Sequence, residues 1–248
     1  MTSLTRTVVI KAEPTTVFRY FTDSARWANW WGAGSTIEAR PGGKVYIRHA
    51  NGVEATGAVK SIEPPRKIAF TLGYVSGKPM PPGSSVVTIG LSAVPEGTRL
   101  ELAHEFEDAE ARDMHVQGWR FQLSMFSNVV ANEVFADSAA RIDTWFDAWT
   151  IPDEGQRATR FAAIASAAIQ VRDRHSLLIG LEDLNAHAGA ALRYRPGVFQ
   201  KRQGDVRQCQ GTALAEWVVP GDKISGTDVF TFGPDGRIES VTGLIHPS

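Results

Sequence analysis

A run of short strands followed by one long helix is the feature that most restricts how this chain can fold. Between residues 35 and 106, apolar and polar residues alternate in short runs that are separated by Gly-Gly, Asn-Gly and Pro-Pro dipeptides. Alternation with a period of two is typical of half-buried strands, and Asn51-Gly52 predicts a type I′ hairpin turn, in which both central residues have positive φ. From Asp113 to about Phe135 the apolar spacing becomes that of an amphipathic helix. This order predicts an antiparallel sheet that curls around one long helix.

Two short helices are predicted before this sheet. Residues 4–12 alternate as a strand that can lie at a sheet edge, and Pro14 then opens a helix where its missing N–H costs little. Asp23 or Ser24 can cap a second helix, which carries three tryptophans within five positions. Short helices at one end of a curled sheet tend to leave an elongated apolar cavity.

The tryptophans are candidates either for core packing or for the wall of that cavity. Because three neighbouring side chains of a helix cannot all point one way, we expect Trp31 and Trp119 to line the cavity and Trp30 to contribute less. His104 shares strand parity with apolar neighbours, so its imidazole faces the apolar side. It is either a ligand contact or a buried histidine that is satisfied by a backbone partner.

Residues 4–135 resemble the START-like (SRPBCC) helix-grip superfamily, in the branch named after the activator of a heat-shock-protein ATPase. The resemblance rests on the following segments: KAEPTTVFRYFTD with the tryptophans after it, RPGGKVYI, GAVKSIEPPRKIAFT, SVVTIGL, GTRLELAHEF and GWRFQLSMF. It implies a ligand cavity that is bordered by the segment from Trp27 to Trp31 and by the helix that carries Trp119. Function in this branch is poorly specified.

After Phe135 the chain starts again with helices before strands. Asp137 or Ser138 can cap a helix that carries Trp145 and Trp149, a second helix runs to about residue 165, and a third is predicted over 180–194. A short strand covers 167–173, and further strands follow from Val198. The chain is therefore predicted to be α+β, with one domain over 1–136 and another over 137–248.

The second half resembles the nuclear-transport-factor-like superfamily, which includes SnoaL-like polyketide cyclases and ketosteroid isomerases. The segments that carry the resemblance are WFDAW, VRDRHSLLIGLEDLNAHAGAAL and GTDVFTFGPDGRIESVTGL. It implies a cone of helices against a curved sheet, with Trp145, Trp149 and Trp217 lining the cone or packing in its core.

The candidate chemical groups of the second half are two carboxylates and two histidines. Proton transfer in an apolar cone needs a carboxylate or an imidazole whose pKa is moved by burial, and the candidates are Asp173, His175, His187 and Asp228. Asp228 shares strand parity with two phenylalanines, so it is either a base or a carboxylate that accepts structural hydrogen bonds. Asp173 and His175 follow a strand and can lie at a cavity mouth, although His175 can equally be an exposed turn residue.

The last strand departs from the cyclase pattern. Relatives commonly carry a Glu-x-Trp stretch followed by an Asp; here Glu239 is present, Val241 takes the aromatic position, and no Asp follows. This departure favours ligand binding over catalysis by that route. It also favours an Asp228 that is paired with backbone amides and faces no cavity.

Composition excludes several classes of function. Twenty-six basic residues against 27 acidic ones leave a net charge of -1, which argues against nucleic acid as a partner. The sequence has no signal-peptide pattern and no run of eighteen apolar residues, so we expect a cytoplasmic protein without a membrane partner. Cys209 is the only cysteine, and neither a P-loop nor a nucleophile elbow nor a zinc motif is present. We expect no cofactor and no metal.

Three functions remain open at this point. The first is a protein that binds a small hydrophobic or aromatic molecule in one or both cavities, with contacts from Trp27, Trp31, His104, Trp119, Trp145, Trp149, His187 and Trp217. The second is a cofactor-independent cyclase, isomerase or hydratase in residues 137–248 that uses Asp228, Asp173 or His175. The third is an interaction module for a chaperone ATPase, suggested only by the name of the first resemblance. A homodimer is compatible with the sequence.

Overall fold

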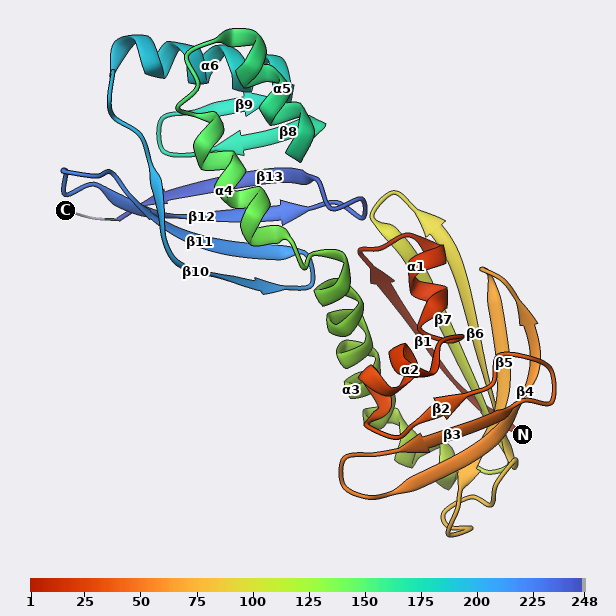
Figure 1. Ribbon diagram of the computed structural model, residues 1–248. Coiled ribbons are helices and arrows are strands. Elements are labelled where there is room, and N and C mark those ends of the chain that lie inside the picture. The colour runs from red at the N-terminus through yellow and green to blue at the C-terminus, as the bar shows by residue number, and fades with distance from the viewer. Residues whose placement is uncertain (247–248) are drawn as a thin grey trace. The chain divides into compact units, whose positions relative to one another are not determined.

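The computed structural model describes residues 1–246, which form two compact units divided between Ala131 and Asn132 (Figure 1). Each unit has its own sheet and its own helices, so the predicted α+β class is confirmed. No helix in residues 1–246 is long and apolar enough to cross a bilayer.

The first unit contains a seven-stranded antiparallel sheet in the order β1-β7-β6-β5-β4-β3-β2. Its elements are β1 (Thr2–Ile10), α1 (Pro14–Arg19), α2 (Ser24–Trp31), β2 (Thr36–Ile37), β3 (Lys44–Arg48), β4 (Glu54–Glu63), β5 (Lys67–Tyr74), β6 (Ser85–Val94), β7 (Gly97–Phe106) and α3 (Ala109–Val134). The first strand lies at a sheet edge, as its alternation predicted, and the long helix begins four residues earlier than the apolar spacing indicated.

Local sequence explains where these elements begin and turn. Pro14 stands at the first position of α1. Along β6 the buried residues alternate with less buried ones, because one face of the sheet packs on the core. The Asn51-Gly52 turn differs from the prediction: Gly52 has a φ of 84°, whereas Asn51 keeps a negative φ. The Asn51 side chain instead accepts a hydrogen bond from the Val53 amide, which makes a wider loop between β3 and β4.

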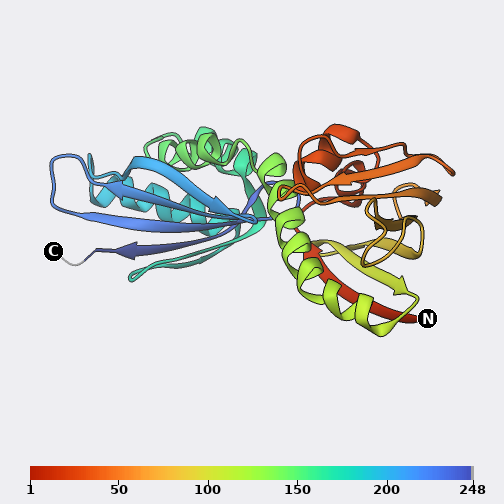
Figure 2. The ribbon, with the colours of Figure 1, turned by 90° about the horizontal axis from the view of Figure 1, so that it is seen from below.

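The second unit contains a six-stranded sheet in the order β10-β11-β12-β13-β8-β9. Its elements are α4 (Ser138–Ala148), α5 (Glu154–Ile164), β8 (Ala165–Arg172), β9 (Leu177–Ile179), α6 (Gly180–Tyr194), β10 (Lys201–Cys209), β11 (Thr212–Val218), β12 (Ser225–Phe232) and β13 (Ile238–Ile245). The pair β13–β8 is parallel, and the other pairs are antiparallel. The three helices gather on one face of this sheet (Figure 2).

Aromatic side chains fill the core between these helices and the sheet. Trp145 of α4 and Phe161 of α5 are fully buried and meet with their ring centroids 5.5 Å apart. Phe135, just before α4, packs on Phe232 of β12 at 5.6 Å. Phe135 therefore belongs to the packing of the second unit, although it lies before the predicted domain boundary.

Candidate functional site

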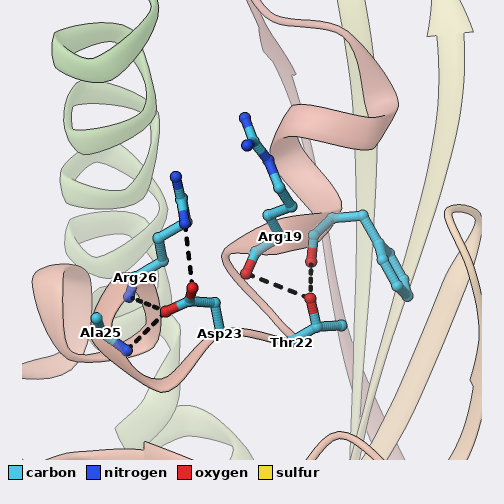
Figure 3. A network of polar contacts seen from close by, with 6 residues as sticks. Arg19, Thr22, Asp23, Ala25 and Arg26 are labelled. Atoms are coloured by element: carbon cyan, nitrogen blue, oxygen red, sulfur yellow. Dashed lines mark hydrogen bonds and ion pairs between the residues drawn. The ribbon is translucent and has the colours of Figure 1, made fainter.

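The tryptophan helix of the first unit is fixed at its start by Asp23. One carboxylate oxygen of Asp23 accepts hydrogen bonds from the amides of Ala25 (2.8 Å) and Arg26 (3.1 Å), and the other pairs with the Arg26 guanidinium (Figure 3). The backbone hydrogen bond from Arg26 is the main cause that lowers the pKa of Asp23. This cap fixes where α2 begins and hence the direction of each tryptophan that follows.

The three tryptophans of α2 have different surroundings. Trp27 is fully buried, donates to the Tyr46 carbonyl, and lies behind the cavity wall rather than on it. Trp30 and Trp31 both line a cavity of about 570 Å³, so Trp30 contributes more than its helix position indicated. The Trp30 indole donates to the Tyr20 carbonyl at 3.4 Å. The Trp31 indole nitrogen is buried and has no hydrogen-bond partner among residues 1–246.

Trp119 also lines this cavity, and its indole is hydrogen-bonded to His104, which lies behind the cavity wall. The Trp119 indole donates to His104 Nδ1 at 2.9 Å, so that nitrogen is an acceptor and His104 Nε2 carries the proton. His104 Nε2 faces the Ser85 hydroxyl at 2.8 Å, and Ser85 donates in turn to the Leu72 carbonyl. Burial lowers the pKa of His104 to about 3. His104 is thus a neutral positioning residue outside the lining of the cavity.

A second polar pair lies on the cavity wall, and the sequence interpretation missed it. The Tyr74 hydroxyl and His115 Nε2 are 3.0 Å apart, and His115 Nδ1 lies 2.6 Å from the Ala111 carbonyl. The carbonyl can only accept, so His115 Nδ1 carries the proton and Tyr74 donates to Nε2. A signal was available, because His115 stands four positions before Trp119 and thus on the same helix face.

The second unit encloses a separate cavity of about 440 Å³. All seven predicted residues of this unit line it: Trp145, Trp149, Asp173, His175, His187, Trp217 and Asp228. They come from α4 and its C-cap, from α6, β11 and β12, and from the turn between β8 and β9. Trp145 and Trp217 are almost fully buried, whereas Asp173 and His175 are exposed, which places these two at the mouth.

Asp228 is the ionisable group buried in this cavity. It is only 4% exposed, and it accepts a 2.8 Å hydrogen bond from the Trp217 indole. No backbone amide in the described chain donates to its carboxyl group, so the structure does not match the expectation of an amide-paired Asp228 that faces no cavity. Burial raises the pKa of Asp228 to about 7, the Trp217 hydrogen bond opposes this rise, and the nearby Asp173 adds to it.

The other polar groups of the cavity differ in their partners. Asp173 accepts a hydrogen bond from the His175 amide at 2.6 Å, which forms a local turn. His187 Nε2 lies 3.3 Å from the Ser176 hydroxyl, and its ring packs edge-on against Trp149 with centroids 6.0 Å apart. The Trp149 indole nitrogen is buried and, within residues 1–246, has no hydrogen-bond partner.

The departure on the last strand has a structural counterpart. Val241 is buried and lines the cavity at the position where relatives carry an aromatic residue, whereas Glu239 is exposed and lies outside the lining. The described residues contain no group of three or more His, Cys, Asp or Glu side chains that could hold a metal ion.

Residues 11–131 match the family model described as Activator of Hsp90 ATPase homolog 1-like protein. No curated protein matches the chain significantly. Among solved structures, a SnoaL-like family protein from Agrobacterium tumefaciens is 22% identical over 44% of this chain and 97% of its own, with a TM-score of 0.42. The Aha1 dimer from Colwellia psychrerythraea is 16% identical over 52% of this chain and 96% of its own, with a TM-score of 0.46. CalU16 from Micromonospora echinospora is 26% identical over 56% and 82%, with a TM-score of 0.44.

Proposed function

We propose a ligand-binding function with acid–base chemistry. The proposal is supported by a first unit in which residues 11–131 match the family model described as Activator of Hsp90 ATPase homolog 1-like protein, and by a second unit with its own cavity. Each cavity binds a small, mostly apolar molecule. In the second cavity, Asp228 also acts as the base that takes a proton from the ligand and later returns it. The chain's own residues supply the whole of this chemistry.

The observation that carries the proposal is the state of Asp228. A carboxyl group whose pKa is about 7 can both take up and release a proton near neutral pH, which is the property of an effective general acid–base. Trp217 occupies one carboxylate oxygen, and the other accepts no hydrogen bond from the described residues. That second oxygen is available to a ligand in the cavity.

The chemistry that fits this arrangement is proton abstraction from a carbon next to a carbonyl group. The Asp228 carboxylate takes the proton, and the electron pair of the broken C–H bond moves onto the carbonyl oxygen to give an enolate. Protonated Asp228 then returns the proton, either to the same carbon or to another carbon of the conjugated system. The enolate oxygen needs a hydrogen-bond donor in the cavity wall, and the polar side chains that line this cavity include Ser176 and His187.

Exchange of carbon-bound protons tests this function without knowledge of the natural substrate. The bicyclic ketone 2-tetralone is incubated with the protein in deuterated water, and loss of its α-proton signals is followed by NMR. We expect the wild type to accelerate exchange and Asp228→Asn to lower the protein-dependent rate by about 100-fold or more. Asp222→Asn, which changes an exposed turn, is the control and should exchange at the wild-type rate. Equal rates in the wild type and Asp228→Asn would exclude Asp228 as the base for this ketone.

A further inference from the structure

Two carboxyl groups of the second cavity border the same space beside Gly243. A Cβ added at Gly243 of β13 would lie 3.2 Å from Asp228 Oδ1 and 3.2 Å from the Cβ of Asp173. All three residues line the cavity. Gly243 is not among the glycines with a positive φ, so its backbone does not itself require a glycine. A ligand can therefore approach both carboxyl groups over Gly243, where another residue would place its side chain.

Each of these carboxyl groups has one oxygen that the protein leaves free. Asp228 Oδ1 accepts a hydrogen bond from the Trp217 indole, and Asp173 Oδ1 accepts one from the His175 amide, whereas the second oxygen of each has no partner among residues 1–246. The second oxygen of Asp228 is not one of the buried unpartnered atoms of the described chain, so part of its surface is accessible. Asp173 is exposed at the cavity mouth. A ligand in the cavity can reach both free oxygens.

The two carboxyl groups have no positively charged partner. Neither forms an ion pair within residues 1–246. The two arginines of the cavity lining do not pair with them: Arg172 donates to Gln170, and Arg195 is exposed at the end of α6. Burial and the charge of Asp173 both raise the pKa of Asp228. An ionised Asp228 therefore lacks the opposite charge that a cationic ligand would supply.

The walls of the cavity favour an organic cation. Trp145, Trp149 and Trp217 line the cavity, and the faces of aromatic rings attract ammonium groups. The described residues contain no group of three acidic, His or Cys side chains that could hold a metal ion. A protonated amine has N–H donors for a carboxylate oxygen, and its hydrocarbon body suits the tryptophan walls.

We propose that the ligand of the second cavity carries a protonated amine, which lies over Gly243, donates a hydrogen bond to the free oxygen of Asp173 and lies beside Asp228. This inference rests on the proposed function in that the second cavity is the ligand site, and it adds the chemical class of the ligand. A cation in this position favours the ionised form of Asp228, which is the form that acts as a base.

Two probes with one carbon skeleton separate the charge from the apolar contact. At pH 8, 2-aminotetralin carries an ammonium group where 2-tetralol carries a neutral hydroxyl group. Dissociation constants of both are measured on the full chain from the indole N–H resonances of Trp145 and Trp217, which report on the second cavity. We expect the wild type to bind the amine about 10-fold or more tightly than the alcohol, because a charge-assisted hydrogen bond is stronger than a neutral one.

Asp173→Asn keeps an acceptor for the His175 amide but removes the charge. In this variant we expect the preference for the amine, taken as the ratio of the two constants, to fall about 3- to 10-fold. Glu239→Gln is the matched control, because it removes one carboxylate from an exposed position of β13 outside the cavity lining, and it should keep the wild-type preference.

The results separate the amine from the ligand site. Equal affinity of the two probes in the wild type, or an unchanged preference in Asp173→Asn, would overturn the amine inference and leave proton transfer by Asp228 standing. Failure of both probes to move the Trp145 and Trp217 resonances of the wild type would overturn the amine inference together with the ligand site.

A second measurement uses the wild type alone. A cation beside a carboxyl group favours its ionised form, so saturating 2-aminotetralin should lower the pKa of Asp228 below its value of about 7, whereas 2-tetralol should not lower it. The titration is followed at the Asp228 carboxyl carbon by NMR. A pKa that stays the same or rises when the amine is bound would place the ammonium group elsewhere and overturn the inference.

Discussion

Trp217 and Asp228 meet diagonally across two paired strands, and the contact depends on a glycine between them. Trp217 of β11 lies opposite Gly226 of β12, and Gly226 stands two residues before Asp228 in the same strand. The Trp217 indole donates to the Asp228 carboxylate at 2.8 Å. A Cβ added at Gly226 would overlap the Trp217 ring. The ring therefore lies over the glycine, and this position brings its N–H to the carboxylate.

The first prediction concerns Gly226→Ala. The added methyl group displaces the Trp217 ring and weakens its hydrogen bond to Asp228. In the wild type this hydrogen bond lowers the pKa of Asp228 and so opposes the effect of burial. We expect the pKa of Asp228 to rise above its wild-type value of about 7. The measurement is a pH titration of the Asp228 carboxyl carbon by NMR. Gly90→Ala in β6 is the control, because a Cβ there has room, and it should leave the titration unchanged. A lower pKa in Gly226→Ala would contradict this account.

The second prediction concerns the pH dependence of stability in Asp228→Asn. The pKa of Asp228 is about 7 in the folded chain, whereas the ordinary value of 3.8 applies to the unfolded chain. Between pH 3.8 and 7 the folded chain therefore binds more protons at this carboxyl than the unfolded chain does. The contribution of Asp228 to stability therefore falls as pH rises from 4 to 7. Asn keeps an acceptor for Trp217 and carries no charge, so the variant should be more stable than the wild type at pH 8.

Hydrogen exchange of the β12 amides measures this effect in the intact protein. At pH 8 we expect stronger protection in Asp228→Asn than in the wild type, and a smaller difference at pH 5. Weaker protection of the variant at pH 8 would show that the ionised carboxylate has a structural role instead.

The third prediction concerns His104 at low pH. Its pKa is about 3 in the folded chain, whereas the ordinary value of 6.5 applies to the unfolded chain. As pH falls, the unfolded chain therefore takes up the proton at a higher pH than the folded chain does. The first unit should lose stability as pH falls from 6.5 toward 3. His104→Asn keeps an acceptor for the Trp119 indole but does not titrate, so its stability should change less over this range. Hydrogen exchange of the β7 amides measures the stability of the first unit in the wild type and in His104→Asn. If stability changes equally with pH in both proteins, His104 is not the cause of the loss of stability at low pH.

The fourth prediction concerns the boundary between the units. Phe135 is 1% exposed and packs on Phe232, so a fragment that begins at residue 137 lacks a buried ring of its core. A fragment over 132–248 should unfold at a higher urea concentration than one over 137–248, by roughly 3–5 kcal/mol in stability if the loss resembles removal of a buried phenylalanine. Equal stability of the two fragments would support the boundary at 136/137 that the sequence predicts.

The order of helices and strands could be predicted from the sequence because each element carries its own local signal. The helix over Gly180–Tyr194 lies where its spacing predicted it, and Pro14 and Asp23 mark helix starts as their chemistry requires. The parallel pairing of β13 with β8 has no such signal. It joins strands about seventy residues apart, and no pattern within either strand indicates its partner.

The candidate site shows the same division between local and distant information. Strand parity indicated that His104 and Asp228 face apolar interiors, and both are buried. Parity cannot say what lies in front of such a side chain: Trp119 covers His104, whereas Asp228 opens onto a cavity. The Tyr74–His115 pair joins a strand and a helix 41 positions apart, so its partners are known only from the fold.

The positions of the sulfur atoms give the two cavities different chemical vulnerability. Three of the four methionines, Met80, Met114 and Met125, line the first cavity, and the last two are 52% and 39% exposed. Among the described residues that line the second cavity there is neither methionine nor cysteine. Peroxide converts exposed thioethers to polar sulfoxides. Oxidative stress would therefore turn the rim of the first cavity hydrophilic and reduce its affinity for apolar molecules, while the lining of the second cavity offers the oxidant no sulfur.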